Sequence, residues 1–97
     1  MTMKTDKEIL EEISTARNYA PHTKITYNTV INNYTEFFGM SMQELLMEAE
    51  KEEEEGVRWK HRKLKKRLMD YRQYCFDKYL VSTARGNLMR IKSVYKF

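Results

Sequence analysis

Turn-forming residues are scarce in this chain, and their scarcity narrows the possible fold more than any other feature. The 97 residues include only three Gly and one Pro, too few for the many turns of a β-sandwich. Hydrophobic residues make up 41% of the sequence, which is enough for one compact core in a chain of this length. We therefore expect an all-α domain whose helices are joined by short links.

Apolar residues at helical spacing predict where these helices lie. Residues 1–18 should form a short N-terminal helical arm, mobile or weakly docked because its apolar stripe is short. Residues 19–97 should form the main domain. Its four helices are expected over 21–38 with Pro21 in the first turn, after a capping box at Ser41 and Glu44, over 58–78, and after an N-cap at Ser82.

The two halves of the chain carry opposite net charge. Residues 1–56 contain five Lys and Arg against twelve Asp and Glu, a balance of −7, whereas residues 57–97 contain thirteen against two, a balance of +11. An asymmetry of this size in a small domain indicates an anionic partner for one face. The alternative is that the acidic run over 48–55 folds back and neutralises the cationic segment over 58–67.

The segment 58–67 holds the densest cluster of cations. Lysine and arginine side chains in such a cluster can contact phosphates and release counterions, which gives affinity that falls with salt. These contacts position a protein on nucleic acid and carry little sequence information. The residues of this segment that we expect to contact DNA are Lys60, His61, Lys63 and Arg67.

The last helix is the better candidate for contacts to bases. Arg85, Asn87, Arg90 and Lys92 lie off its apolar stripe, and we expect the first three to share its exposed side. Arginine pairs bidentately with guanine in the major groove, and asparagine pairs with adenine. Gly86 weakens a helix interior, which a close approach to DNA or to another helix would explain. The alternative is an ordinary polar helix surface.

Signatures of enzymes and metal sites are missing from the sequence. It contains no Gly-rich phosphate loop, no CxxC and no HExxH,. His22 and His61 are far apart, and Cys75 has no close His, so we expect no metal, no cofactor and no catalysis by this chain alone. A single cysteine fits a reducing, cytoplasmic setting. No apolar run approaches the ~20 residues of a membrane span, and no signal peptide is expected.

Two stretches resemble a known family. The stretch 21–27, Pro-His-Thr-Lys-Ile-Thr-Tyr, with Tyr34 and Phe38 after it, resembles the opening of the N-terminal core-binding domain of phage-integrase-type tyrosine recombinases. The stretch 82–95, from Ser-Thr to Val-Tyr, is similar to the closing helix of that domain, and 71–79 is similar to the helix before it. The resemblance covers about residues 19–97 and is closest in style to archaeal integrases.

The resemblance implies a four-helix, SAM-like orthogonal bundle that clamps one side of a recombination site. The catalytic tyrosine of the family belongs to a separate domain, so no catalytic residue is expected here. The expected partners are double-stranded DNA and further recombinase subunits on that DNA. The first and last core helices of the family meet the major groove, which implies DNA contacts for Thr23, Lys24, Thr83, Arg85 and Arg90.

Two other interpretations remain open at this point. The chain could be a helical protein-interaction module whose acidic and basic halves pair between subunits. It could also be a helix-turn-helix regulator, although the long helix expected over 58–78 argues against the tight turn and recognition helix of that motif.

Overall fold

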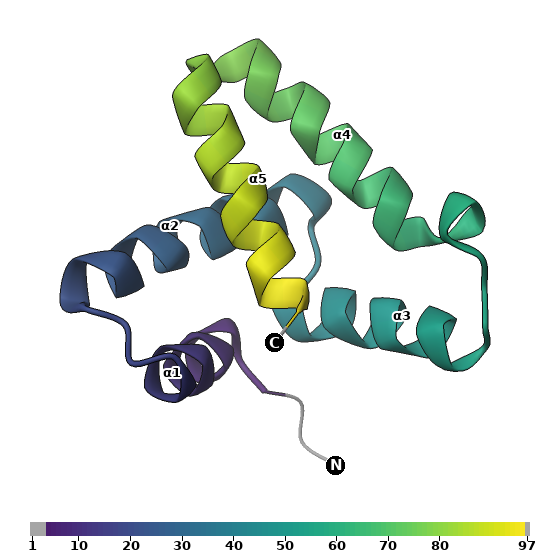
Figure 1. Cartoon of the computed structure of the whole chain (residues 1–97), viewed down its shortest axis with the longest axis horizontal. Helices are drawn as coiled ribbons and strands as arrows, with labels where there is room; N and C mark the ends of the chain where they lie inside the picture. The colour runs from purple at the N-terminus through teal and green to yellow at the C-terminus, as the bar shows by residue number, and fades with distance from the viewer. Residues whose placement is uncertain (1–3, 97) are drawn as a thin grey trace.

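The computed structural model describes residues 4–96 and consists of five α-helices and one short 3₁₀ helix (Figure 1). In chain order they are α1 (Asp6–Ala16), α2 (Pro21–Phe38), α3 (Met42–Glu54), η1 (Trp59–His61), α4 (Lys63–Lys78) and α5 (Val81–Tyr95). These residues contain no strand, so the all-α prediction is confirmed for this part of the chain. No helix within it is both long and apolar enough to cross a membrane.

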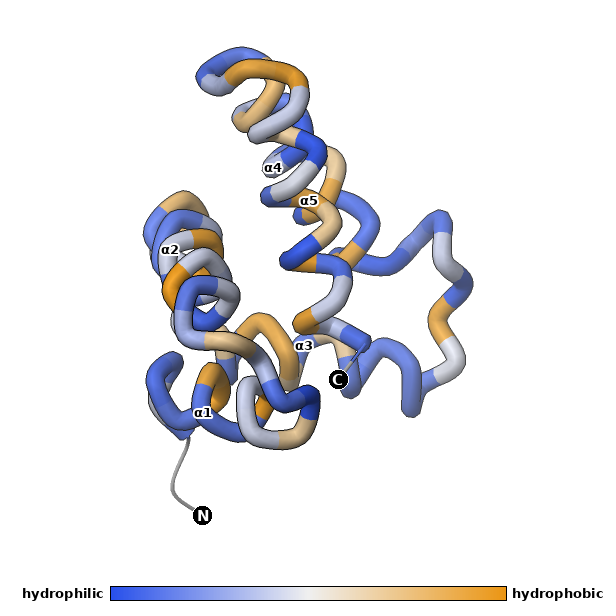
Figure 2. Tube along the Cα trace, turned by 60° about the vertical axis from the view of Figure 1, so that its left-hand side comes forward, coloured by the Kyte–Doolittle hydropathy of each residue, from blue (hydrophilic) through white to orange (hydrophobic). Residues whose placement is uncertain are grey.

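The helices pack around one hydrophobic core, with α5 in contact with both α2 and α4 (Figure 1). α1 packs against α2 and α3, and α3 packs against α4. Figure 2 shows that the second half of α3 and the connection after it are mostly hydrophilic, because the glutamate run and the cationic segment meet there. The most charged part of the chain therefore lies at the edge of the bundle rather than across its core.

α1 is a full member of this bundle. Ile9, Leu10 and Ile13 are buried in the core that all five α-helices share. The Asp6 carboxylate accepts a hydrogen bond from the backbone N–H of Met42, 2.8 Å away at the start of α3. The expectation of a mobile or weakly docked arm is therefore wrong, and the bundle has five helices rather than four. The short apolar stripe suffices because α1 lies against two neighbours at once.

The ends of α2 and α3 follow local sequence signals. α2 spans 21–38 as predicted, with Pro21 in its first turn and Gly39 after it at a φ of 63°, a left-handed conformation that glycine adopts without strain,. The predicted capping box of α3 is confirmed. The Ser41 hydroxyl accepts from the backbone N–H of Glu44 at 3.2 Å, and the Glu44 carboxylate accepts from the backbone N–H of Ser41 at 3.3 Å.

The helix predicted over 58–78 is divided into η1 and α4. Arg62 between them is extended, with φ −75° and ψ 138°, and its Nε donates to the carbonyl oxygen of Val57 at 2.7 Å. A continuous helix would place many cations one turn apart, where like charges destabilise the helix. The break relieves part of that repulsion. A prediction from apolar spacing alone does not take the repulsion between cations into account.

α5 begins two residues earlier than predicted. Leu80 is its N-cap and makes no side-chain capping bond, and Ser82 lies inside the first turn. Only Tyr79 and Leu80 link α4 to α5, so the helix starts where this short link ends. Burial of Ala84 and the apolar residues after it outweighs the preference of serine for the cap.

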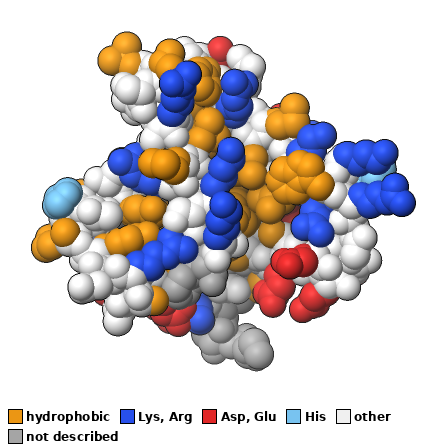
Figure 3. All heavy atoms as spheres, viewed as in Figure 1, with side chains coloured by type: hydrophobic (Ala, Val, Ile, Leu, Met, Phe, Trp, Pro, Cys, Tyr) orange, Lys and Arg blue, Asp and Glu red, His pale blue; other side chains and the backbone are white. Residues whose placement is uncertain are grey.

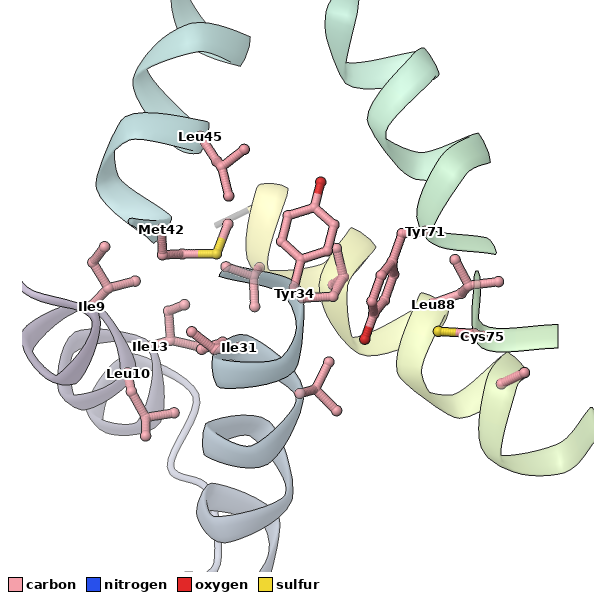
Figure 4. Packing of buried hydrophobic residues seen from close by; sticks show 14 residues of the cluster. Ile9, Leu10, Ile13, Ile31, Tyr34, Met42, Leu45, Tyr71, Cys75 and Leu88 are labelled. Atoms are coloured by element: carbon pink, nitrogen blue, oxygen red, sulfur yellow. The ribbon is translucent and has the colours of Figure 1, made fainter. Parts of the chain in front are cut away.

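The core is centred on two fully buried tyrosines, Tyr34 of α2 and Tyr71 of α4 (Figure 4). Their rings meet edge to face, with centroids 4.9 Å apart. The hydroxyls of Tyr34 and Tyr95 are hydrogen-bonded at 2.8 Å, and the Tyr71 hydroxyl donates to Oδ1 of Asn33 at 2.6 Å. Burial raises the pKa of both Tyr34 and Tyr71, and their hydrogen bonds avoid the cost of unsatisfied buried hydroxyls.

Replacement of Ile13 tests whether α1 is part of the core. Ile13→Ala should lower the free energy of unfolding by about 2–5 kcal/mol, because it leaves a cavity at a fully buried position,. Ile25→Ala is the matched control, since Ile25 is 67% exposed and its loss should cost no more than about 0.5 kcal/mol. Urea unfolding followed by circular dichroism measures both, and equal small effects would contradict a docked α1.

Candidate nucleic-acid interface

The acidic run of α3 neutralises one arginine of the cationic segment. Nε and Nη2 of Arg67 donate to the two carboxylate oxygens of Glu48 at 2.7 and 3.0 Å. The Arg67 guanidinium also lies over the ring of Phe38, 4.9 Å from its centroid. The hydrogen bonds from Arg67 hold the pKa of Glu48 below its ordinary value. Arg67, which the sequence assigned to DNA contact, is therefore committed to joining α3 to α4.

Glu52 stabilises the start of α4 in a different way. Both of its carboxylate oxygens accept from the backbone N–H of Lys63, at 2.8 and 3.0 Å. A negative group at this position satisfies a free helix N–H and offsets the unfavourable position of the cations near the positive end of the helix dipole. The bond uses only the backbone of Lys63, and its side chain is left at the surface.

The rest of the acidic run leaves the cationic segment unpaired. Glu55 lies 3.9 Å from Lys51 of its own helix. Within residues 4–96, no other glutamate of the run forms an ion pair with the segment 58–67. Neutralisation by ion pairing, the alternative raised by the sequence, therefore holds for Arg67 alone.

The unpaired cations of this segment surround a shallow hollow of about 350 Å³ at η1 and the first turn of α4. Asp70 is the one acidic residue in its lining. Trp59, at the start of η1, is 51% exposed, so it is not the core anchor that a lone tryptophan often provides. We call five of the lining residues the η1 cluster: Lys60, His61, Lys63, Lys65 and Lys66.

A second positive surface lies between α4 and α5. It is a groove of about 500 Å³, and every charged residue in its lining is a cation. Its floor is apolar and includes Phe76, whose ring lies 4.8 Å from the guanidinium carbon of Arg72. We call this surface the basic groove, and its cations are Arg17, Arg72, Arg85, Lys92 and Lys96.

Sequence reasoning missed three cations of the basic groove. Arg17 was assigned to the arm, yet its Nη2 donates to the carbonyl oxygen of Ser93 at 3.0 Å and its Nη1 donates to the Ser93 hydroxyl. Arg72 lies outside the dense segment 58–67. Lys96 was detectable, because it follows Lys92 by four residues and so lies on the same side of a helix. The contact of Arg17 with α5 depends on tertiary packing and leaves no local signal.

The predicted residues of α5 separate onto two flanks of the helix. Arg85 and Lys92, seven residues apart, line the basic groove. Thr83, Asn87 and Arg90 are spaced by four and three residues and share the other flank. The Asn87 side chain is half-buried. The expectation that Arg85, Asn87 and Arg90 share one exposed side is therefore wrong.

The α2 candidates lie apart from both positive surfaces. Thr23 is half-buried in the first turn of α2, and Lys24 forms an ion pair with Glu11 of α1. Figure 3 shows Lys and Arg side chains in a row over α5 and in a second group at the connection from α3 to α4. Cations over α5 and cations at the connection from α3 to α4 are thus visible on the same face of the molecule.

The chemistry that this face offers is binding of an anion. Its groups are Lys and Arg donors over an apolar floor, which attract negative charge and hydrogen-bond phosphate oxygens. Cys75 is buried, and burial raises the pKa of its thiol, so it is a poor nucleophile at neutral pH. No group of three or more His, Cys, Asp or Glu within residues 4–96 is arranged to hold a metal ion.

Comparison with protein families, with curated proteins and with solved structures gave no match to this chain. Its function must therefore be inferred from its own residues and geometry, together with the resemblance described above.

The Glu48–Arg67 pair predicts a pH-dependent contribution to stability. Glu48→Gln should lower the free energy of unfolding by about 1.5–3 kcal/mol at neutral pH, because a charge-assisted hydrogen bond is lost. The folded pKa of Glu48 lies below its ordinary 4.5. The wild type therefore keeps this stabilisation above that pH and loses it as the pH falls through the lowered folded pKa.

Urea unfolding of both chains between about pH 7 and pH 3 measures this contribution. The difference between them should be constant above the ordinary pKa and should close in acid. Glu53→Gln is the control, because Glu53 is exposed and forms no ion pair within the described residues. A difference that stays the same down to the lowest pH would show that the Glu48 carboxylate is not stabilised by Arg67.

Proposed function

We propose that this chain binds double-stranded DNA through the face that carries the basic groove and the η1 cluster. The observation that carries the proposal is the lining of the groove, in which all five charged residues are cations. Phosphates neutralised there would release condensed counterions and supply a large, sequence-independent part of the binding free energy. The η1 cluster adds further cations on the same side of the molecule (Figure 3).

The arrangement of α5 favours a duplex over other polyanions. Cations project from both of its flanks, with Arg85 and Lys92 on one side and Arg90 on the other. The major groove of B-DNA admits an α-helix, and side chains on its two flanks then come within reach of phosphates and base edges. The long axes of the domain measure 37 and 36 Å, close to the ~34–36 Å of one turn of the duplex. The two positive surfaces can therefore reach phosphates within one turn.

The resemblance to tyrosine recombinases extends this proposal. In that setting the chain is the non-catalytic front domain of a site-specific recombinase or integrase and clamps one side of the recombination site. The cleavage chemistry belongs to a different domain in that family. The implied contact from Lys24 would require its ion pair with Glu11 to open, so we assign the main contacts to the basic groove and the η1 cluster instead.

A protein-interaction module is the second candidate, and the unpaired end of the acidic run favours it. Glu50, Glu53 and Glu54 are exposed and form no ion pair within the described residues. In a second copy, the η1 cluster would supply the opposite charge. This candidate predicts self-association that weakens with salt and is indifferent to DNA, which light scattering distinguishes from binding to a duplex.

Binding to a labelled duplex over a salt series tests the proposed function. Affinity measured by fluorescence anisotropy should fall steeply with salt. Arg85→Ala and Lys63→Ala should each weaken binding to every duplex alike and reduce the log–log salt slope by about 0.9, the value for one lost phosphate contact. Lys7→Ala on α1 removes the same charge outside the linings of both positive surfaces and should change little.

Two results would overturn the proposal. One is an absence of binding at low salt, and the other is binding whose affinity does not change with salt. Equal effects of Lys7→Ala and Lys63→Ala would show that only net charge matters, and would remove the assignment of this face.

A further inference from the structure

Gly86 lies in the interior of α5, where glycine weakens a helix by about 1 kcal/mol relative to alanine. A Cβ atom at Gly86 would lie 2.8 Å from Nη1 of Arg90, 3.7 Å from its Cζ and 4.0 Å from its Nη2. These are the three nearest atoms outside the local backbone. The glycine is therefore not explained by a neighbouring helix, because what approaches it is the guanidinium of Arg90, one turn along the same helix.

Arg90 is placed without a carboxylate partner. Arg67 is held by Glu48, whereas Arg90 forms no ion pair or side-chain hydrogen bond with any residue of 4–96. Its guanidinium rests on the bare surface of the helix at Gly86. The missing Cβ gives the guanidinium room to lie there, and its N–H donors stay available to a ligand,.

We infer that Gly86 is a specificity-determining residue that positions Arg90 for bidentate pairing with a guanine in the major groove. The inference rests on the proposed function, and it goes further by naming guanine as the base that Arg90 recognises. Arginine pairs with O6 and N7 of guanine through two parallel hydrogen bonds. Such a pair depends on the position and the plane of the guanidinium, which the surface at Gly86 provides.

The distances decide how strongly Gly86 controls this geometry. Ordinary van der Waals contact for a Cβ begins at 3.4 Å, whereas the Arg90 guanidinium lies at 2.8 Å from the Cβ position. An alanine would therefore displace the guanidinium by about 0.6 Å, beyond the roughly 0.5 Å within which a recognition group must be held. The side chain is flexible at this end, so the fold accommodates the change while the base contact does not.

Selection from a pool of randomised duplexes, using the full chain, tests the inference. The wild type should enrich a guanine at one position of the bound sequences. Gly86→Ala and Arg90→Ala should both lose that enrichment. Gly86→Ala changes no charge, so it should keep its affinity for random-sequence duplex within about threefold. The melting temperature of Gly86→Ala should rise by a few degrees, because alanine favours the helix and nothing but Arg90 has to move.

Two control variants separate positioning from general effects on α5. Ser82→Ala also raises helix propensity on α5. Ser82 lies four residues before Gly86 and eight before Arg90, so the change leaves the surface at Gly86 intact and should leave the enrichment unchanged. Arg85→Ala removes the same side chain from the other flank, and it should weaken all duplexes alike while the guanine preference persists.

The possible failures are distinguishable. Enrichment of the same guanine by Gly86→Ala and by the wild type would overturn the role of Gly86 and leave the proposed function standing. A fall in the melting temperature of Gly86→Ala would show that the glycine serves packing, and would overturn the inference as well. If the wild type binds no duplex at low salt, the proposed function fails and the inference fails with it.

Discussion

The hydroxyl of Tyr34 is buried where α2, α4 and α5 meet, and it must find a partner there. Its ring is fully buried and contacts the rings of Phe38, Tyr71 and Tyr95. The Tyr95 hydroxyl supplies the hydrogen bond, and burial raises the pKa of Tyr95 to about 12. Because an unpaired hydroxyl at this depth would be costly, α5 must lie where Tyr95 can reach Tyr34. That orientation decides which flanks of α5 face the solvent and therefore where its cations project.

Contacts from the acidic run also stabilise the fold. The acidic run is used selectively, because Glu48 pairs with Arg67 at the core edge and Glu52 binds the backbone N–H at the start of α4. Both contacts join α3 to α4, so these two glutamates stabilise the fold. The lysines of the η1 cluster are left facing outward. A chain with a small net charge of +4 thus presents one strongly positive face.

The sequence was sufficient to predict those features of the fold that depend on residues close together in the chain. The extent of α2 and the capping box at Ser41 follow from local chemistry, and both were predicted. The docking of α1 was not, because its strength comes from two neighbouring helices rather than from its own short stripe. Arg17 reaches Ser93 across 76 positions of sequence, and no local pattern indicates such a contact. The separation of Arg85 from Asn87 was predictable, since residues two apart lie on nearly opposite sides of a helix.

The bond between Tyr34 and Tyr95 also orders the events of synthesis. The two residues are 61 positions apart, and of the five α-helices within residues 4–96, α5 is synthesised after the other four. α1, α2 and α3 can pair while the chain is still growing, because their contacts lie within the first half of the sequence. The Tyr34 hydroxyl then stays hydrated until α5 emerges and supplies the Tyr95 hydroxyl. The acidic half of the chain is thus exposed before the basic face exists, and that face forms only once α5 has been synthesised.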